Sequence, residues 1–229
     1  MEKILNIVVP MAGLGSRFQK VGYELPKPLI DVLGETMISL VVRNLTPNRP
    51  HRFIFICQRD HDDRYSIKKH LEELTPNCAV KLIDGVTEGA ACTVLEARDI
   101  LEPDQPLMIA NCDQFVEASL DAYLEEWEAS ESCGYIMTMR ASEDKWSFVK
   151  LSSTGLVSEV VEKVVVSDEA TVGIYNFSKG GDFVAGADAM IQQELRVNGE
   201  FYVAPVFNTL IEEGYRVGIH NIGECDEKM

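Results

Sequence analysis

Two segments near the start of the chain together supply glycines and basic side chains. The first is Met11-Ala12-Gly13-Leu14-Gly15-Ser16-Arg17, and ten residues further on Lys27 stands between two prolines. Gly13 and Gly15 let the backbone approach a phosphate closely, and successive N–H groups in such a turn bind anions. Arg17 adds a planar fork of donors for phosphate oxygens, and Lys27 adds a mobile point charge. A glycine turn alone is weak evidence, but with these cations it indicates a phosphate site.

A carboxylate occurs where an apolar run ends. The run is 107–110, and Asn111-Cys112-Asp113-Gln114 follows it. Mg²⁺ favours hard oxygens from one or two carboxylates together with substrate phosphates, so Asp113 is a candidate magnesium ligand. An Asp in this position is also common as a helix cap or turn residue.

Further candidates come later in the chain. Thr87-Glu88-Gly89-Ala90-Ala91 opens a predicted helix, where Thr87 is a candidate N-cap and the small residues leave room for a flat ring beside unpaired N–H groups. Glu162 and Lys163 are neighbours at the end of a predicted strand. Their side chains should therefore point to opposite faces, and most such pairs are solvated.

The first segment resembles the signature of the sugar-phosphate nucleotidyltransferases, the nucleotide-sugar pyrophosphorylases. The usual form is L-A-G-G-x-G-T-R followed by P-K-P, and here Leu14 replaces a glycine and Ser16 a threonine. The resemblance implies that the turn binds the nucleotide through Ala12, Gly13, Gly15 and Ser16. It also implies that Arg17 neutralises the leaving phosphates, that Lys27 lies near the α-phosphate, and that Asp113 holds Mg²⁺.

The same resemblance implies two more binding segments. Residues corresponding to Glu88, Gly89 and Ala90 pack against the base and ribose. The family often has Q-x-G-T-A here, so the departure leaves the base open. On the acceptor side, Lys163 contacts the phosphate and Glu162 the hydroxyls, although Val164 replaces the usual proline.

The acceptor side is completed by Gly173 and by Glu200, which would accept hydrogen bonds from hydroxyls. Glu200 has the alternative of simply leading into the next helix. Family members often add a second metal carboxylate after the last strand, and Asp226 is the nearest candidate here. The alternatives are that Asp226 is solvated at a frayed end or that the sequence continues beyond it.

The elements that must position these residues follow from hydrophobic periodicity. We expect strands at 4–10, 53–57, 80–83, 107–111 and 135–140, and helices at 36–45, 61–74, 89–101 and 119–129. This alternation indicates βαβ units, a parallel sheet covered on both faces, and ligands at the carboxyl ends of the strands. Strands at 148–151, 157–161 and 171–177, with a turn at 153–155, predict antiparallel hairpins. Helices at 183–195 and 204–213 and a strand at 215–219 follow.

The predicted fold class is therefore α/β. We expect a Rossmann-like, open, mostly parallel sheet flanked by helices, with an antiparallel hairpin portion appended in the C-terminal third. We also expect a single domain over 1–229, in which 1–140 bind the nucleotide and 141–229 the acceptor. The apolar pattern at 201–210 fits either buried core or a dimer face, so a homo-oligomer stays open.

Composition narrows the class of protein. The 229 residues are 46% apolar and 25% charged, as in a soluble globular protein, and the net charge is −16. So acidic a surface argues against nucleic-acid and anionic-membrane partners. The chain shows no signal peptide, and its six scattered cysteines fit reduced thiols, which favours the cytoplasm.

The function predicted is Mg²⁺-dependent transfer of a nucleotidyl group from an NTP to a phosphorylated acceptor. A sugar 1-phosphate is the first expectation, because the short chain resembles small bacterial enzymes that make capsule or lipopolysaccharide precursors. CTP with a phosphorylated non-sugar acceptor is the second. A non-catalytic nucleotide sensor is a further alternative, but it would not need Lys163. A dinucleotide-dependent oxidoreductase is disfavoured because a third glycine is missing.

Overall fold

Strand β1 (Leu5–Pro10) is an interior strand of a nine-stranded sheet in the part of the chain that the structure describes. The structure is a computed structural model and describes residues 3–13, 15, 18, 22–23 and 25–225. Parallel neighbours of β1 are β4 (His51–Gln58) on one side and β6 (Leu107–Ala110) on the other, and β5 (Ala79–Ile83) extends the sheet beyond β4. The carboxyl ends of these strands share one edge, as the βαβ pattern predicted.

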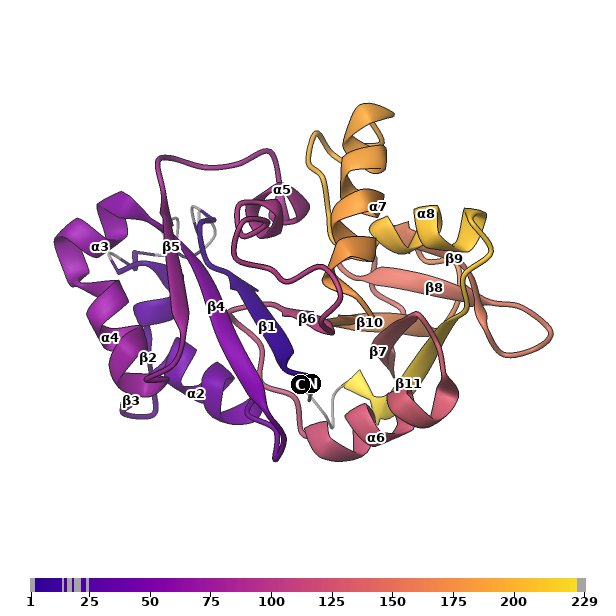
Figure 1. The fold of residues 1–229 in the computed structure, drawn as a ribbon, viewed down its shortest axis with the longest axis horizontal. Helices are drawn as coiled ribbons and strands as arrows, with labels where there is room; N and C mark the ends of the chain where they lie inside the picture. The colour runs from indigo at the N-terminus through magenta and orange to yellow at the C-terminus, as the bar shows by residue number, and fades with distance from the viewer. Residues whose placement is uncertain (1–2, 14, 16–17, 19–21, 24, 226–229) are drawn as a thin grey trace.

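The C-terminal third adds antiparallel strands to this sheet (Figure 1). Strand β10 (Glu169–Phe177) runs antiparallel between β6 and β7 (Gly134–Arg140), and β11 (Val217–Glu224) lies parallel to β7. The hairpin of β8 (Ser147–Leu151) and β9 (Val157–Glu162) joins the sheet through β10. The predicted α/β fold class with an antiparallel portion is confirmed.

Helices cover both faces of the sheet because strand side chains alternate between them. In β1, Leu5, Ile7 and Val9 pack into the core beneath α2 (Met37–Asn44), α4 (Ile67–Leu74) and α6 (Leu120–Ser130). Val8 packs into the opposite core, beneath α5 (Ala90–Leu95), α7 (Gly180–Gln192) and α8 (Val206–Glu212). No described helix is long and apolar enough to cross a membrane.

Two predicted helices differ from the structure. The helix expected at 61–74 is two helices, α3 (Arg59–Tyr65) and α4, because Ser66 adopts a left-handed conformation with φ 52° between them. The helix expected at 89–101 is α-helical only in α5. Beyond Leu95, N–H groups bond to carbonyls three residues back, as Ala97 does to Val94, which tightens the chain into successive turns.

Hydrophobic periodicity did not predict the shorter elements. A 3₁₀ turn, η1 (Lys27–Leu29), precedes a small hairpin of β2 (Asp31–Val32) and β3 (Glu35–Thr36). Helix α7 begins at Gly180 and ends at Gln192, three residues earlier at each end than expected.

The apolar pattern at 201–210 belongs to the core of the chain itself. Phe201, Val206 and Phe207 are fully buried, and Leu210 is 3% exposed. They pack with residues of α7 and the sheet, and the ring of Phe207 stacks on Phe177 with centroids 4.4 Å apart. The pattern therefore reflects core packing and not a dimer face.

Candidate functional site

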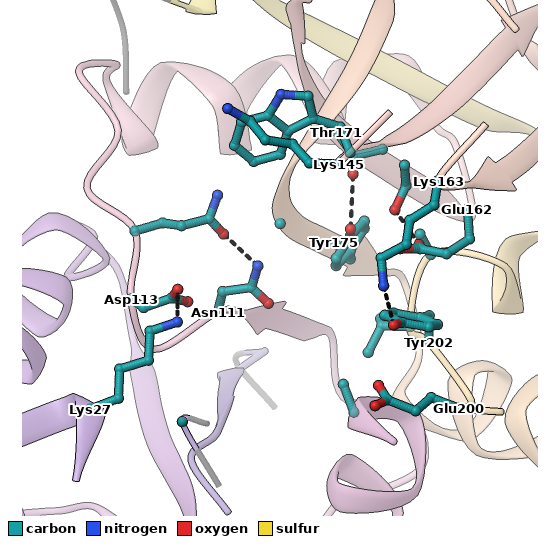
Figure 2. Close-up of a pocket in the computed structure, with 18 of the residues that line it drawn as sticks. Lys27, Asn111, Asp113, Lys145, Glu162, Lys163, Thr171, Tyr175, Glu200 and Tyr202 are labelled. Carbon is teal, nitrogen blue, oxygen red and sulfur yellow. Dashed lines mark hydrogen bonds and ion pairs between the residues drawn. The ribbon is translucent and has the colours of Figure 1, made fainter. Parts of the chain in front are cut away.

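A cavity of about 760 Å³ opens where the carboxyl ends of β1 and β6 meet the hairpins of the C-terminal third (Figure 2). It is lined from both halves of the chain. Eight of the residues singled out from the sequence line it: Gly15, Lys27, Ala90, Asp113, Glu162, Lys163, Gly173 and Glu200. A single cavity thus unites segments that are up to 185 residues apart, from Gly15 to Glu200.

On the side nearer β1, Lys27 and Asp113 point toward each other and form an ion pair (Figure 2). Asp113 follows β6, whereas Lys27 begins η1, with Pro26 before it and buried Pro28 within it. The side chains are 24% and 29% exposed, so ligands can reach both. Gly15, at φ 61°, packs closely here, since a Cβ on it would lie 3.5 Å from that of Lys27.

The chemistry of this wall fits a magnesium ion that is shared with substrate phosphates. Asp113 supplies a hard carboxylate oxygen, and Mg²⁺ in nucleotide sites commonly takes only one or two carboxylates besides phosphate and water. Among the described residues no group of three or more His, Cys, Asp or Glu side chains could hold a metal by itself. Asp226, the predicted second ligand, lies outside the described residues, as do Ser16 and Arg17.

On the opposite wall, Glu162 and Lys163 face the same cavity. The expectation that they point to opposite faces is wrong, because β9 ends at Glu162 and Lys163 adopts a left-handed conformation with φ 56°. The Lys163 ammonium donates to the hydroxyl of Tyr202 and lies 4.1 Å from the centre of its ring. A turn in the backbone, not a strand face, thus places this cation.

Glu162 is an almost fully buried carboxylate at 6% exposure, and it accepts a hydrogen bond from the hydroxyl of Ser147. Burial raises the pKa of Glu162, while the Ser147 hydrogen bond and the nearby Lys163 charge act in the lowering direction. Tyr175 lies close by, and its hydroxyl shares a hydrogen bond of 2.9 Å with Thr171. The wall therefore offers several groups that can bind hydroxyls.

Gly173 lies between these walls at an irregularity of β10, where the pairing with β7 shifts register between Thr171 and Tyr175. Its φ is 81°, and a Cβ would lie 2.2 Å from both the Asn111 Nδ2 and the Gln114 Oε1. The Asn111 amide donates a hydrogen bond to the Gln114 amide oxygen. A larger residue at this position would have to displace the amide ends of these two side chains.

Four predicted nucleotide-side residues do not line the cavity. Ala12 is buried, and its carbonyl accepts a hydrogen bond from the Gln58 amide at 2.7 Å, while Gly13 is exposed. Glu88 points elsewhere and pairs with Arg196 at 2.6 Å. Gly89 is needed for close packing, because a Cβ there would lie 2.4 Å from the carbonyl oxygen of Phe201.

The N-terminus of α5 also differs from the expectation. Its N-cap is Gly89 and not Thr87, whose hydroxyl donates instead to the Gly89 carbonyl at 2.9 Å. The Ala91 N–H, expected to be open to a ligand, donates to the carbonyl of Phe201 at 3.0 Å. One of the helix-start donors is therefore already used within the fold.

Several lining residues were not assigned a role from the sequence. Lys145 forms an ion pair with Glu143, and its ammonium lies 4.9 Å from the ring centre of Trp146, which also lines the cavity. Asn111, Gln114 and Tyr202 were visible only as neighbours of predicted residues. The one available signal for Lys145 was its place just before the strand that pairs with the Glu162 segment.

The comparisons define the class of protein. Residues 7–197 match the family model described as "Nucleotidyl transferase", and the chain belongs to this family. A search of the curated proteins finds no match.

Solved structures narrow the class. The chain is similar to a nucleoside-diphosphate-sugar pyrophosphorylase from Vibrio cholerae RC9, with 26% identity over 95% of this chain and 92% of that one, and a TM-score of 0.78. The fold is also that of a putative glucose-1-phosphate thymidylyltransferase from Bacillus anthracis (17% identity, 95% and 87% covered, TM-score 0.73). It is likewise shared with the inositol-1-phosphate CTP transferase from T. maritima (12% identity, 97% and 88% covered, TM-score 0.70). The chain is a nucleotidyltransferase of the nucleotide-sugar pyrophosphorylase type.

Proposed function

We propose that the enzyme joins an NTP to a sugar 1-phosphate and releases pyrophosphate, giving a nucleotide sugar. The observation that carries the proposal is a single cavity with the Lys27–Asp113 pair on one wall and Glu162 and Lys163 on the other. The first wall suits the phosphates of a nucleotide, and the second suits a phosphate attached to a hydroxyl-rich group. Residues 1–140 would then bind mainly the nucleotide and 141–229 the acceptor.

In the proposed reaction, an oxygen of the acceptor phosphate attacks the α-phosphorus of the NTP. The new O–P bond forms as the bond between the α-phosphorus and the bridging oxygen to the β-phosphate breaks, and pyrophosphate leaves with that electron pair. The attacking oxygen is already anionic, so no general base is required. Catalysis then consists of positioning and charge stabilisation.

The residues have separate tasks in this proposal. Lys27 stabilises charge at the α-phosphate, and Lys163 orients the acceptor phosphate. Glu162 and Glu200 accept hydrogen bonds from acceptor hydroxyls, while Gly15 and Ala90 let the nucleotide approach the backbone. Asp113 would hold Mg²⁺, which when bound neutralises phosphate charge. Ser16, Arg17 and Asp226 keep the roles implied by the family signature.

The acceptor is proposed from the chemistry of its wall. Two carboxylates and the hydroxyls of Thr171 and Tyr175 match an acceptor with several hydroxyl groups. Such a product is an activated precursor, and a cytoplasmic role in supplying capsule or lipopolysaccharide sugars forms part of the proposal through the family resemblance. A phosphorylated non-sugar alcohol with CTP would use the same residues and is the competing acceptor class.

The test is a pyrophosphate-release assay with ATP, GTP, CTP, UTP and dTTP, each with glucose 1-phosphate or inositol 1-phosphate and Mg²⁺. We expect release with glucose 1-phosphate and one nucleotide, and none without an acceptor. Release with inositol 1-phosphate alone would transfer the assignment to the non-sugar class. No release in any pairing of a wider panel of sugar 1-phosphates would contradict the proposal.

A further inference from the structure

Residues 196–204, which we call the strap, lie between α7 and α8 and contribute four residues to the cavity lining: Glu200, Tyr202, Val203 and Ala204. Glu200 and Tyr202 enter the cavity from the strap (Figure 2), while Phe201 between them is fully buried. Asn198 and Gly199 both have positive φ, and Val197 and Glu200 exchange two backbone hydrogen bonds of 3.0 Å. This tight two-residue turn sets the direction in which Glu200 leaves the strap.

The backbone of the strap is bonded to the start of α5. The Phe201 N–H donates to the Glu88 carbonyl at 2.9 Å, and the Ala91 N–H donates to the Phe201 carbonyl at 3.0 Å. The missing Cβ of Gly89 permits this approach. The wall that faces the acceptor is thus attached to a segment whose Ala90 lines the nucleotide side.

Arg196 ties the same two segments together through side chains. Its guanidinium pairs with Glu88 and with Glu194, each at 2.6 Å, and donates to the Gly199 carbonyl at 3.3 Å. The guanidinium carbon also lies 4.0 Å from the centre of the buried Phe201 ring. A planar cation can make these contacts at once, whereas an ammonium cannot.

We propose that Arg196 is a positioning residue for acceptor binding. By holding the strap against Glu88 it fixes Tyr202, and Tyr202 in turn holds the ammonium of Lys163. The proposal rests on the proposed function, because it takes Lys163 as the group that binds the acceptor phosphate. Glu88 then acts outside the cavity, as the partner of Arg196 in this ion pair.

A comparable ion pair provides the matched control. Arg98 pairs with Asp188 of α7 at 2.7 Å, and both side chains are about half exposed. This pair also joins the region after α5 to α7, but neither Arg98 nor Asp188 is among the described residues that line the cavity. Loss of Arg98 therefore reports the effect of removing a surface ion pair alone.

The first test is hydrogen–deuterium exchange of the unliganded protein, read at the amides of Ala91 and Phe201. In Arg196→Ala we expect both to exchange at least fivefold faster than in the wild type, and in Arg98→Ala we expect no change. Glu88→Ala should reproduce much of the effect, and the double variant Glu88→Ala/Arg196→Ala should add little to Arg196→Ala, as expected for one shared contact. Unchanged protection in Arg196→Ala would overturn the proposal.

The second test uses the transfer assay with glucose 1-phosphate and the nucleotide that the wild type accepts. Arg196→Ala should raise the acceptor KM about fivefold and leave the KM of the nucleotide within twofold, whereas a merely structural loss would change both. An unchanged acceptor KM would also overturn the inference. If the wild type transfers to no acceptor, the proposed function fails, and the exchange comparison still decides whether Arg196 holds the strap.

Discussion

At the scale of single residues, the site places three lysines in one cavity of a strongly acidic molecule. The chain carries a net charge of −16, yet Lys27, Lys145 and Lys163 line one cavity. Each is held by a partner in the fold: Asp113, Glu143 and Tyr202, respectively. Positioned charges of this kind stabilise a transition state without first having to reorganise.

Replacing Lys163 should affect the acceptor more than the nucleotide. We expect Lys163→Ala to lower kcat/KM for the acceptor about 100-fold, on the scale of ~3 kcal/mol for one electrostatic donor. The control is Lys150→Ala on the β8–β9 hairpin. Lys150 forms an ion pair with Glu159, with 2.6 Å between the ammonium and the carboxylate, and neither residue lines the cavity. Steady-state kinetics with each substrate varied in turn would check this. Equal kinetics in both variants would exclude Lys163 from the reaction.

Glu162 gives a prediction that depends on pH. Burial raises the pKa of Glu162 in the folded protein above its ordinary value of 4.5. At a pH between these two pKa values, the folded state keeps a proton on Glu162 that the unfolded state has released. Above that interval the buried charge costs stability. Glu162→Gln should therefore melt higher than the wild type at pH 8, and this gain should vanish as the pH falls toward 4.5.

The same variant should lose activity, since an amide is a weaker acceptor for hydroxyl hydrogen bonds than a carboxylate. We expect a fall of about 10- to 100-fold in kcat/KM for the acceptor, from ~1.5–3 kcal/mol for a hydrogen bond to a charged group. Thermal melting at several pH values and acceptor kinetics check the two parts. A melting temperature below the wild type at pH 8 would contradict the burial argument.

At the scale of elements, positive φ values shape the cavity. Gly173 combines a φ of 81° with contact to the amides of Asn111 and Gln114, whereas Gly155, in the hairpin turn, has the same φ and nothing within 4 Å of its Cβ position. Alanine substitutions at these two glycines therefore separate the cost of backbone strain from the cost of displacing the amides.

Gly173→Ala should therefore destabilise the protein by about 1 kcal/mol more than Gly155→Ala, which carries only the ~1–2 kcal/mol of a left-handed alanine, because the two amide side chains must also be displaced. It should also impair acceptor use, whereas Gly155→Ala should not. Urea unfolding of both variants measures the difference. Equal destabilisation would mean that the amide pair moves aside at no cost.

These same features mark how far the sequence could predict the site. Residue type and context indicated Lys27, between two prolines, and Asp113, after an apolar strand, whereas the roles of Glu162 and Lys163 came from the family resemblance. Residue type and context could not show that Lys163 turns back beside Glu162, or that Ser66 breaks a helix, because both depend on a single left-handed residue. The roles of Arg196 and Tyr202 could not be predicted because they depend on contacts with Glu88 and Lys163, which lie more than 30 residues away in the sequence.

At the scale of the whole molecule, the fold class followed from the alternation of strands and helices. What the sequence could not show is that β10 inserts between β6 and β7, which brings Gly173 against Asn111. Hydrophobic periodicity within each segment predicts strands and helices, but it does not predict the order of the strands in the sheet. The cavity that joins the two halves of the chain is a consequence of this insertion.

Binding of the nucleotide with Mg²⁺ should stabilise the whole molecule. A ligand at 100 times its Kd adds ~2.7 kcal/mol, which for a chain of this size raises the Tm by about 5–10 °C. Chelation of Mg²⁺ with EDTA should remove most of the shift, and Asp113→Asn should remove its Mg²⁺-dependent part. A shift that is equally large in Asp113→Asn would show that this carboxylate holds no metal.

The proposed reaction joins the acceptor phosphate to the α-phosphate of the nucleotide. The direct measurement is a ³¹P NMR spectrum of the completed reaction with the accepted nucleotide and sugar 1-phosphate. We expect two mutually coupled resonances of a diphosphate diester together with free pyrophosphate, and much weaker product resonances in Lys163→Ala after the same reaction time. Pyrophosphate with only nucleoside monophosphate, which is the product of hydrolysis, would contradict the proposed reaction.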